Sequence, residues 1–530
     1  MTDPATQKGS DPLTLQRGLT PVAPEGVRPH DADGRAALKG RHLDIKEMGL
    51  VREVKGMVAR IVGLPSCISG QLVTFSSGVL GMIMGYDLHE AHALILGDAA
   101  DIRTGEQVYG RAEPLRIPVG AAVIGRVVNA LAEPMDGQGP IAYEAHYPIF
   151  RKAPGIMERV PIAKPLETGI KILDTMIPIG KGQRELILGD RMTGKTTLAL
   201  DTIMNQRDKS VTCIYCCIGR SYTTLTRVVQ LLIAGEAMGY TFIVAETAAA
   251  PPGRQFLVPY AACTLGEFFM DQGQDVLIVF DDLTRHAWIH RQISLLLGRP
   301  PGREAYPGDM FYVHSQLMER AGALSPEKGG GSMSFLPIVE TQQGDVTSHI
   351  PSNVISITDG QTYLSTPLFT EGFKPAIDLG LSVSRIGSKV QSAAMRDVSR
   401  PLRLEYLQFK ELERVTKLRA NLSEEMAKKL TAGAVLRELL IQDRSQPVPT
   451  EAQVVLFEAH RRGILATRSL EEVRRFKREF FPFLQSKNPA LVEALKMTQA
   501  LTDQVSARLT QAYTEFFGGA TPEGVRPKGV

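Results

Sequence analysis

A short segment from Gly189 to Thr196 has the residue types and spacing of a phosphate-binding loop. It reads GDRMTGKT and matches the pattern G-x-x-x-x-G-K-[ST]. Glycines at these positions let backbone N–H groups point toward phosphate oxygens, and a helix that follows adds the positive end of its dipole. Lys195 would then reach the terminal phosphates, and the Thr196 hydroxyl would ligate Mg²⁺. The segment predicts a site for a nucleoside triphosphate.

The sequence on either side of this loop predicts the elements that must position it. Leu186 to Gly189 is an apolar run typical of a buried strand, and Thr196 to Gln206 has the pattern of a helix. These flanks favour a phosphate site over an ordinary glycine turn. We therefore expect nucleotide contacts from Gly189, Asp190, Arg191, Met192, Thr193, Gly194, Lys195, Thr196 and Thr197.

A carboxylate after a second apolar run supplies the other half of a magnesium site. Asp281 is the first acid after Val276 to Phe280. The alternative is an acid that only ends a strand, but carboxylate and hydroxyl oxygens are suitable ligands for Mg²⁺ beside a phosphate. We therefore predict Mg²⁺ and ATP or ADP as cofactors, with Thr196 and Asp281 on the metal.

Two further clusters have a functional and a structural interpretation. The segment VTCIYCCIG has C-x-x-C spacing, but it runs apolar like a core strand and has no second pair at zinc-site spacing. His286 and His290 lie one helical turn apart, but Ala287 stands where a zinc protease needs Glu. We expect structural roles for both clusters.

Composition excludes several classes of protein. The 530 residues carry a net charge of +3, which does not support nucleic-acid binding by bulk electrostatics. The basic run RRFKREFF is more typical of a solvated helix face. No apolar run reaches about 18 residues, and the N-terminus lacks the plan of a secretory signal. We expect a cytosolic protein that has no membrane span.

The pattern of predicted strands, helices and turns along the sequence predicts a multidomain fold. We expect a flexible segment over 1–44, a small β-barrel over 45–118, a nucleotide-binding α/β domain with a mostly parallel sheet over 119–400, a helical bundle over 401–517 and a flexible tail over 518–530. The reasons are short strands between Gly and Pro turns, then alternating strands and helices, then apolar residues at three- and four-residue spacing.

Long blocks of the sequence resemble the α subunits of F-type ATP synthases. They include GQRELILGDRMTGKT, RPPGREAYPGDMFYVHSQLMERA, GGGSMSFLPIVETQQGDVTSHIPSNVISITDGQ and PAIDLGLSVSRIG, within a match over 49–517. The resemblance implies a β-barrel, a RecA-like domain and a C-terminal helical domain. It implies a ring of three α and three catalytic β subunits around a γ rotor stalk, on the cytoplasmic face of the membrane and joined to the membrane sector through the complex.

The resemblance also implies that α sites bind Mg-ATP without turning it over. The catalytic β subunit has a Glu after the strand that follows the phosphate-loop helix, and Arg220 stands at that position here. Arginine stays protonated and cannot act as a base. The family's usual α residue is Gln, so Arg220 is a departure that either contacts or obstructs the γ-phosphate.

Further residues come from the resemblance alone. Arg385 matches the arginine finger that α offers to the neighbouring β site, and Ser382 belongs to the same signature. Contacts to the adenine side are implied for Lys374, Pro375, Gln442 and Arg444, among which Lys374 and Arg444 depart from the usual residues, as Met192 does in the loop. The atypical N-terminus leaves the attachment to the peripheral stalk and its δ subunit open.

Two other functions are compatible with a phosphate loop. A self-sufficient RecA-like ATPase, such as a type III secretion or transcription-termination motor, should have a Glu at or near position 220. A terminator should also carry exposed aromatic residues on its barrel, whereas Trp288, the single Trp, is far from the barrel. A purely structural nucleotide-binding paralogue is the non-enzymatic alternative, and the retained Arg385 argues against it.

Overall fold

The computed structural model describes residues 47–416 and 423–518 of the chain. The predicted flexible segments, 1–44 and 518–530, lie outside the described residues except for Gly518.

The first described element is a closed six-stranded barrel with the strand order β1-β2-β5-β4-β3-β6. Its interior is filled by fully buried apolar side chains, including Val73, Ile83 and Val108. Closure pairs every strand on both sides and leaves no open sheet edge. The strands are β1 (Met48–Lys55), β2 (Val58–Val62), β3 (Gln71–Phe75), β4 (Leu80–Tyr86), β5 (Ala91–Ile95) and β6 (Gln107–Pro114). Beyond them β7 (Arg116–Val119) pairs with β9 (Ala145–Pro148) in a separate two-stranded sheet.

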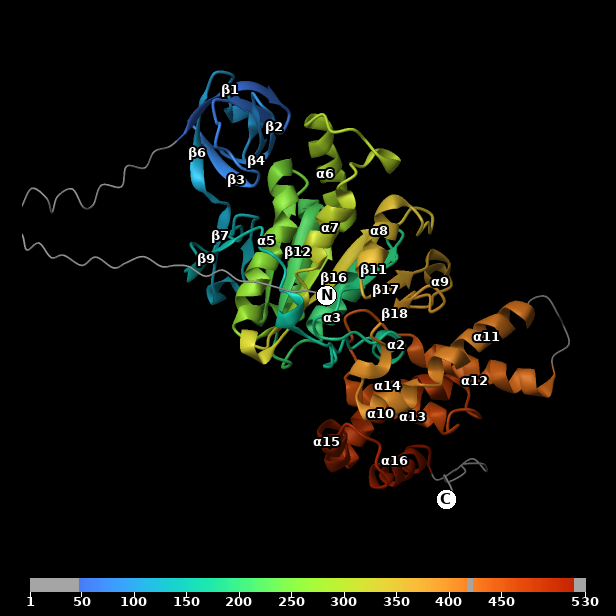
Figure 1. Ribbon diagram of the computed structural model, residues 1–530. Helices are drawn as coiled ribbons and strands as arrows, with labels where there is room; N and C mark the ends of the chain where they lie inside the picture. The colour runs from blue at the N-terminus through green and yellow to red at the C-terminus, as the bar shows by residue number, and fades with distance from the viewer. Residues whose placement is uncertain (1–46, 417–422, 519–530) are drawn as a thin grey trace, which may run out of the picture. The chain divides into compact units, whose positions relative to one another are not determined.

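The central domain is built on a ten-stranded sheet (Figure 1). Its main strand order is β18-β17-β11-β16-β14-β12-β13-β8. All pairs between β17 and β8 are parallel, whereas β18, β15 and β10 pair antiparallel. The strands are β8 (Val127–Val128), β10 (Arg159–Val160), β11 (Glu185–Gly189), β12 (Val211–Arg220), β13 (Thr241–Thr247), β14 (Asp275–Asp281), β15 (Gly322–Leu324), β16 (Ser332–Glu340), β17 (Gly360–Leu364) and β18 (Val383–Ser384).

Helices cover both faces of this sheet, which explains why β12 is apolar along nearly its whole length. Cys213, Tyr215 and Cys217 pack with the core residues of α3 and α4, whereas Ile214 and Cys216 pack with those of α5. The cysteine-rich segment is therefore a core strand, as predicted, and all five cysteines are buried and unpaired. The helices are α2 (Lys171–Met176), α3 (Lys195–Met204), α4 (Tyr222–Ala234), α5 (Pro252–Asp271), α6 (Leu283–Leu296), α7 (Met310–Met318), α8 (His349–Ile357) and α9 (Thr366–Thr370).

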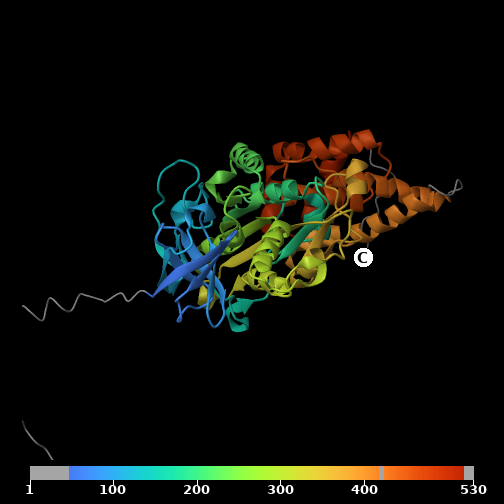
Figure 2. The same ribbon diagram turned by 90° about the horizontal axis from the view of Figure 1, so that it is seen from above.

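The last part of the described chain is helical, and Figure 2 shows these helices in orange to red as one group. They are α10 (Ala393–Ser399), α11 (Leu402–Thr416), α12 (Glu424–Leu440), α13 (Thr450–Arg461), α14 (Leu470–Lys487), α15 (Pro489–Thr498) and α16 (Asp503–Phe516). A capping box between Ser469 and Glu472 begins α14, where Phe476 and Phe480 turn inward and the arginines of RRFKREFF stay exposed. The predicted fold class is confirmed.

No helix in residues 47–416 or 423–518 is long and apolar enough to cross a membrane.

Candidate functional site

The phosphate loop joins the end of β11 to the start of α3, as the sequence predicts. Gly189 has φ 153° and Gly194 has φ 103°, a region of backbone conformation that L side chains rarely adopt. A Cβ at Gly189 would also press against the carbonyl oxygen of Leu364 on β17. Both glycines are therefore required for the loop to turn tightly over the end of the sheet.

The Asp190 side chain fixes the loop from outside. Its Oδ1 accepts hydrogen bonds from Thr341 Oγ1 at 2.7 Å and from Gly344 N at 2.8 Å, and its Oδ2 accepts one from Thr366 Oγ1 at 3.0 Å. Met192, at the apex, has φ 64° and is 91% exposed. Asp190 thus anchors the loop to the segments after β16 and β17, and Met192 faces outward.

Lys195 lies at the first position of α3 and is buried. Its Nζ donates to the carbonyl oxygens of Gly189 at 2.8 Å and Asp190 at 2.6 Å. Burial lowers the pKa of this ammonium from its ordinary value. The cation is held at the mouth of the loop, where phosphate oxygens would meet it.

Asp281 ends β14 beside the loop, and its Oδ2 accepts hydrogen bonds from Thr196 Oγ1 at 2.8 Å and from Tyr215 OH at 2.7 Å. The structure brings together the two residues predicted to hold a metal. Tyr215, which sequence reasoning missed, lies in β12, the strand next to β14. Its only signal in the sequence was a hydroxyl-bearing side chain within a run of buried apolar residues.

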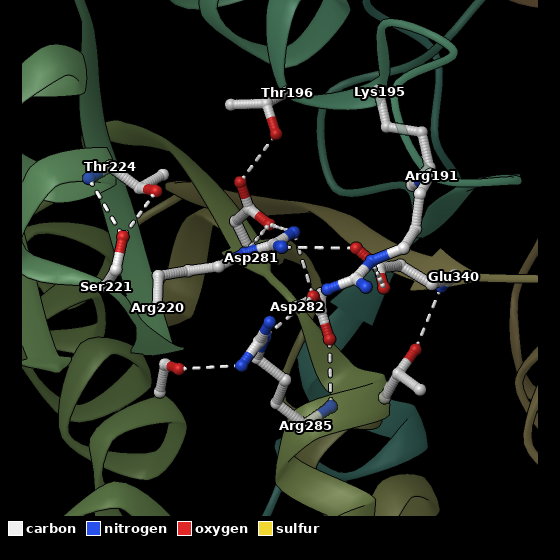
Figure 3. A network of polar contacts seen from close by, with 12 residues as sticks. Arg191, Lys195, Thr196, Arg220, Ser221, Thr224, Asp281, Asp282, Arg285 and Glu340 are labelled. Carbon is white, nitrogen blue, oxygen red and sulfur yellow. Dashed lines mark hydrogen bonds and ion pairs between the residues drawn. The ribbon is translucent and has the colours of Figure 1, made fainter. Parts of the chain in front are cut away.

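Arg220 extends from the end of β12 onto a group of carboxylates (Figure 3). Its Nε donates to Asp281 Oδ1 at 3.0 Å, its Nη2 lies 2.8 Å from Asp282 Oδ2, and its Nη1 donates to Glu340 Oε1 at 3.1 Å. Burial acts against the charged form, but Asp281 and Asp282 raise the pKa of Arg220 still further. The side chain thus contacts three acidic groups, and its predicted contact with a phosphate stays a prediction.

Asp282 and Glu340 complete this acidic group. Asp282 Oδ1 caps α6 by accepting from Arg285 N at 2.8 Å, and burial, followed by the charge of Asp281, raises the pKa of Asp282 to about 7 despite Arg220. Glu340 ends β16 and lies 3.4 Å from Arg191 Nε. Sequence reasoning missed Glu340, although it is the first acid after the apolar run Phe335 to Val339, the same signal that identified Asp281.

A pocket of about 580 Å³ opens beside the loop. It is lined by part of the loop, by α3, by Phe369 of α9 and by the segments that follow α9 and α12. Lys374 Nζ lies 4.9 Å from the centre of the Phe369 ring. The predicted adenine-side residues Lys374, Pro375, Gln442 and Arg444 all line this pocket, together with Met192, Thr193, Gly194 and Thr197. A nucleotide base could therefore lie in this pocket with its phosphates at the loop.

Arg385 and Ser382 do not line this pocket. Arg385 follows β18 and is exposed, with one long contact of 3.4 Å from Nη2 to Ile355 O. Ser382 is buried, and its Oγ donates to Asp378 O at 2.6 Å and accepts from Tyr363 N at 2.9 Å. Within the described residues, Ser382 holds the turn before β18, and the Arg385 guanidinium has no acidic partner.

The oxygen donors at the loop have the right chemistry for Mg²⁺. In the described part of the chain, no three His, Cys, Asp or Glu side chains are arranged to hold a metal ion by themselves. Mg²⁺ at nucleotide sites takes one or two protein ligands and completes its shell with phosphate oxygens and water. The Thr196 hydroxyl and the neighbouring Asp281 fit that limited role.

His286 and His290 lie in α6 and are both buried. His286 Nε2 lies 3.1 Å from Phe256 O, and His290 Nε2 lies 2.9 Å from Asp309 Oδ1. The predicted structural role agrees with these contacts.

Comparison with known proteins identifies three matching family models. They are the beta-barrel domain of the ATP synthase alpha/beta family over residues 44–111, the nucleotide-binding domain of that family over 169–384 and its C-terminal domain over 391–516.

Similar proteins span nearly the whole chain. The ATP synthase subunit alpha of Clostridium botulinum (strain Eklund 17B / Type B) is 46% identical over 470 residues, which cover 89% of this chain and 93% of the relative. The ATP synthase subunit alpha of Caldanaerobacter subterraneus subsp. tengcongensis is 45% identical over 495 residues, covering 93% of this chain and 98% of the relative.

Proposed function

The chain belongs to the ATP synthase alpha/beta family, and from this we propose that it is an α-type subunit that binds Mg-ATP without turning it over. The observation that carries the proposal is Arg220 at the position of the catalytic base. Its guanidinium is bound to Asp281, Asp282 and Glu340. A permanently protonated group cannot take a proton from water.

The remaining parts of the site support binding. Backbone N–H groups of residues 189–194 and the start of α3 would hold the phosphates, and Lys195 would offset their charge. The Thr196 hydroxyl would hold Mg²⁺ with Asp281 beside it, and the ion would neutralise part of the phosphate charge. Lys374, Pro375, Gln442 and Arg444 would enclose the base and ribose in the adjacent pocket.

The chemistry that this chain assists would take place in a neighbouring catalytic β subunit. We propose that Arg385 extends into that site as an arginine finger and that Ser382 holds the turn that positions it. The ring of α and β subunits would surround a γ rotor and attach to a peripheral stalk. It would couple ATP synthesis or hydrolysis to ion transport at the cytoplasmic face of the membrane.

The purified full-length chain tests this proposal directly. We expect it to bind ATP in the presence of Mg²⁺, measured by isothermal titration calorimetry, and to release no phosphate above the uncatalysed background. Lys195→Met should abolish binding, because it removes the ammonium held at the mouth of the loop. Sustained turnover by the isolated wild-type chain would refute the non-catalytic assignment.

A further inference from the structure

Three carboxylates lie close to the phosphate loop. Asp281 ends β14, Asp282 follows it as the N-cap of α6, and Glu340 ends the adjacent strand β16. Their side chains are only 0%, 0% and 12% exposed. Carboxylates and a polyphosphate have the same sign of charge, and in a partly desolvated site they repel strongly. A nucleotide can bind beside this group only if a cation lies between the two.

The Arg220 guanidinium supplies a cation in direct contact with these carboxylates. It comes from β12, on the other side of β14 from β16, and contacts all three carboxylates while remaining 14% exposed (Figure 3). Its planar fork carries five N–H donors, a number that suits several acidic partners at once. Arg285, by contrast, approaches only one of these three acids, with its Nε 3.7 Å from Asp282 Oδ2.

Arg220 also uses the oxygens that a divalent ion would need. Asp281 Oδ1 accepts from Arg220, and its Oδ2 accepts from both Thr196 and Tyr215. Of the two predicted metal ligands, the Thr196 hydroxyl is therefore the one left to face an ion, and Mg²⁺ would gain little direct contact with the Asp281 carboxylate. A covalently attached cation also has constant occupancy, whereas a bound ion exchanges with the medium.

We propose that the Arg220 guanidinium is a built-in counter-cation that largely replaces Mg²⁺ in charge balance, so this chain binds ATP with little dependence on the metal. This inference rests on the proposed nucleotide binding. The metal still accompanies the bound nucleotide through Thr196, but it contributes little to affinity.

The test compares the affinity of the full-length chain for ATP in excess MgCl₂ and in EDTA, measured by calorimetry. For the wild type we expect dissociation constants within about threefold of each other. Arg220→Gln removes the charge and leaves a polar side chain, so binding in EDTA should become about tenfold or more weaker than binding in MgCl₂.

Two further variants control for folding and for general charge. Arg220→Lys keeps the charge, but one ammonium cannot contact three carboxylates together. The ratio of its ATP affinity in MgCl₂ to that in EDTA should therefore fall between the ratios of the wild type and of Arg220→Gln. Arg285→Gln removes a cation from the same region while Arg220 keeps its contacts, and its ratio should equal that of the wild type. Each variant is used only if its thermal melting is cooperative.

The outcomes separate this inference from the proposed function. ATP binding that depends equally on Mg²⁺ in the wild type and in Arg220→Gln overturns the inference and leaves the nucleotide-binding function intact. Binding by Arg220→Gln but not by the wild type identifies Arg220 as an obstruction and overturns both. The absence of binding in all variants also overturns both.

Discussion

Gln442 illustrates how one residue can line a ligand pocket and also hold that pocket together. Its Oε1 accepts from Lys171 N at 3.0 Å, and its Nε2 donates to Gly169 O at 2.8 Å and Gln446 O at 2.9 Å. The side chain thus ties the segment after α12 to the start of α2. Arg444, two residues on, is exposed and lines the same pocket.

Gln442→Ala should therefore reduce stability even without nucleotide. The loss of these hydrogen bonds leaves backbone groups of α2 and the loop without partners, at a cost of about 1–2 kcal/mol in the free energy of unfolding. Arg444→Ala should change stability by less than about 0.5 kcal/mol, because it is a surface substitution. Urea denaturation of the nucleotide-free variants distinguishes the two. Equal stabilities would mean that Gln442 only contacts the ligand.

Single residues were predictable where the site is contiguous in sequence, and less so where strands meet. The phosphate loop lies within eight consecutive positions, and Asp281 follows a clear apolar run. Tyr215 and Glu340 belong to the site because β12, β14 and β16 are neighbours in the sheet. That order does not follow from sequence periodicity. The contacts of Arg220 with the three acids depend on the same adjacency.

At the scale of elements, α5, α6 and α7 pack through aromatic rings and histidines. His286 stacks on Phe256 of α5 at 5.2 Å between ring centres and on His314 of α7 at 5.6 Å. Within the described structure, neither ring nitrogen of His314 has a hydrogen-bond partner. Asp309 contacts His290 and Arg299, and it has no hydrogen bond with His286 or His314 in the described structure. These helices bury imidazoles that have little to stabilise a positive charge.

Stability should consequently decrease in mild acid. Burial lowers the pKa of His286 to about 3 and that of His314 well below 6.5. Below pH 6.5 the unfolded chain takes up protons on these histidines that the folded chain does not. Their contribution to the free energy of unfolding is therefore complete above pH 6.5 and is lost as the pH falls toward 3. In this range each histidine lowers the free energy of unfolding by about 1.4 kcal/mol for every pH unit of acidification. Urea midpoints from about pH 7.5 to about pH 5 measure it.

His314→Phe provides the matched comparison for this pH dependence. Phenylalanine has a similar shape and removes no hydrogen bond, so stability near neutral pH should be almost unchanged. The slope below pH 6.5 should become shallower, since one of the two buried imidazoles is gone. An unchanged slope in this variant would assign the acid sensitivity to carboxylates elsewhere.

The contact between α11 and α12 depends on a glycine within a helix. A Cβ at Gly433 of α12 would collide with the Phe409 ring of α11. Gly433→Ala gains about 1 kcal/mol in helix propensity but overpacks this contact at a cost of about 1–3 kcal/mol. We expect a net loss in unfolding free energy of about 1 kcal/mol, measured by urea denaturation. In a Phe409→Leu background, the same substitution should be neutral or stabilising, and a loss of the same size in both backgrounds would exclude the steric explanation.

Element types followed from periodicity, whereas their connections did not. The predicted strand from Val211 to Gly219 agrees closely with β12, because both its faces are covered and its residues are apolar along nearly its whole length. The pairing of β7 with β9 instead of with the barrel depends on long-range contacts. The spacing of apolar residues predicts which positions of a segment are buried, but it does not predict which other segment buries them.

At the scale of the whole molecule, the exposed charge of Arg385 has no acidic partner among the residues that the structure describes. The side chain is exposed after β18, and its backbone N–H donates to Asp359 O at 2.9 Å, which fixes the position of the main chain. Ser382 stabilises the preceding turn through Asp378 and Tyr363. A rigid backbone with a solvent-facing guanidinium suits a contact to an anionic group on another subunit.

Arg385→Ala should therefore abolish turnover by an assembly reconstituted with catalytic β subunits, while ATP binding to this chain stays unchanged. A finger of this kind contributes on the order of 10³ to 10⁵ in rate, because the guanidinium stabilises charge on the transferring phosphoryl group. Arg385→Lys should recover only part of the rate, since an ammonium lacks the planar fork. Arg400→Ala, at another exposed arginine, is the control and should leave the rate within about twofold. Both readouts are needed, steady-state hydrolysis by the assembly and calorimetry on the isolated chain. Full turnover by the Arg385→Ala assembly would remove the finger from the proposal, and a parallel loss of ATP binding by the isolated variant would assign Arg385 a structural role within its own subunit.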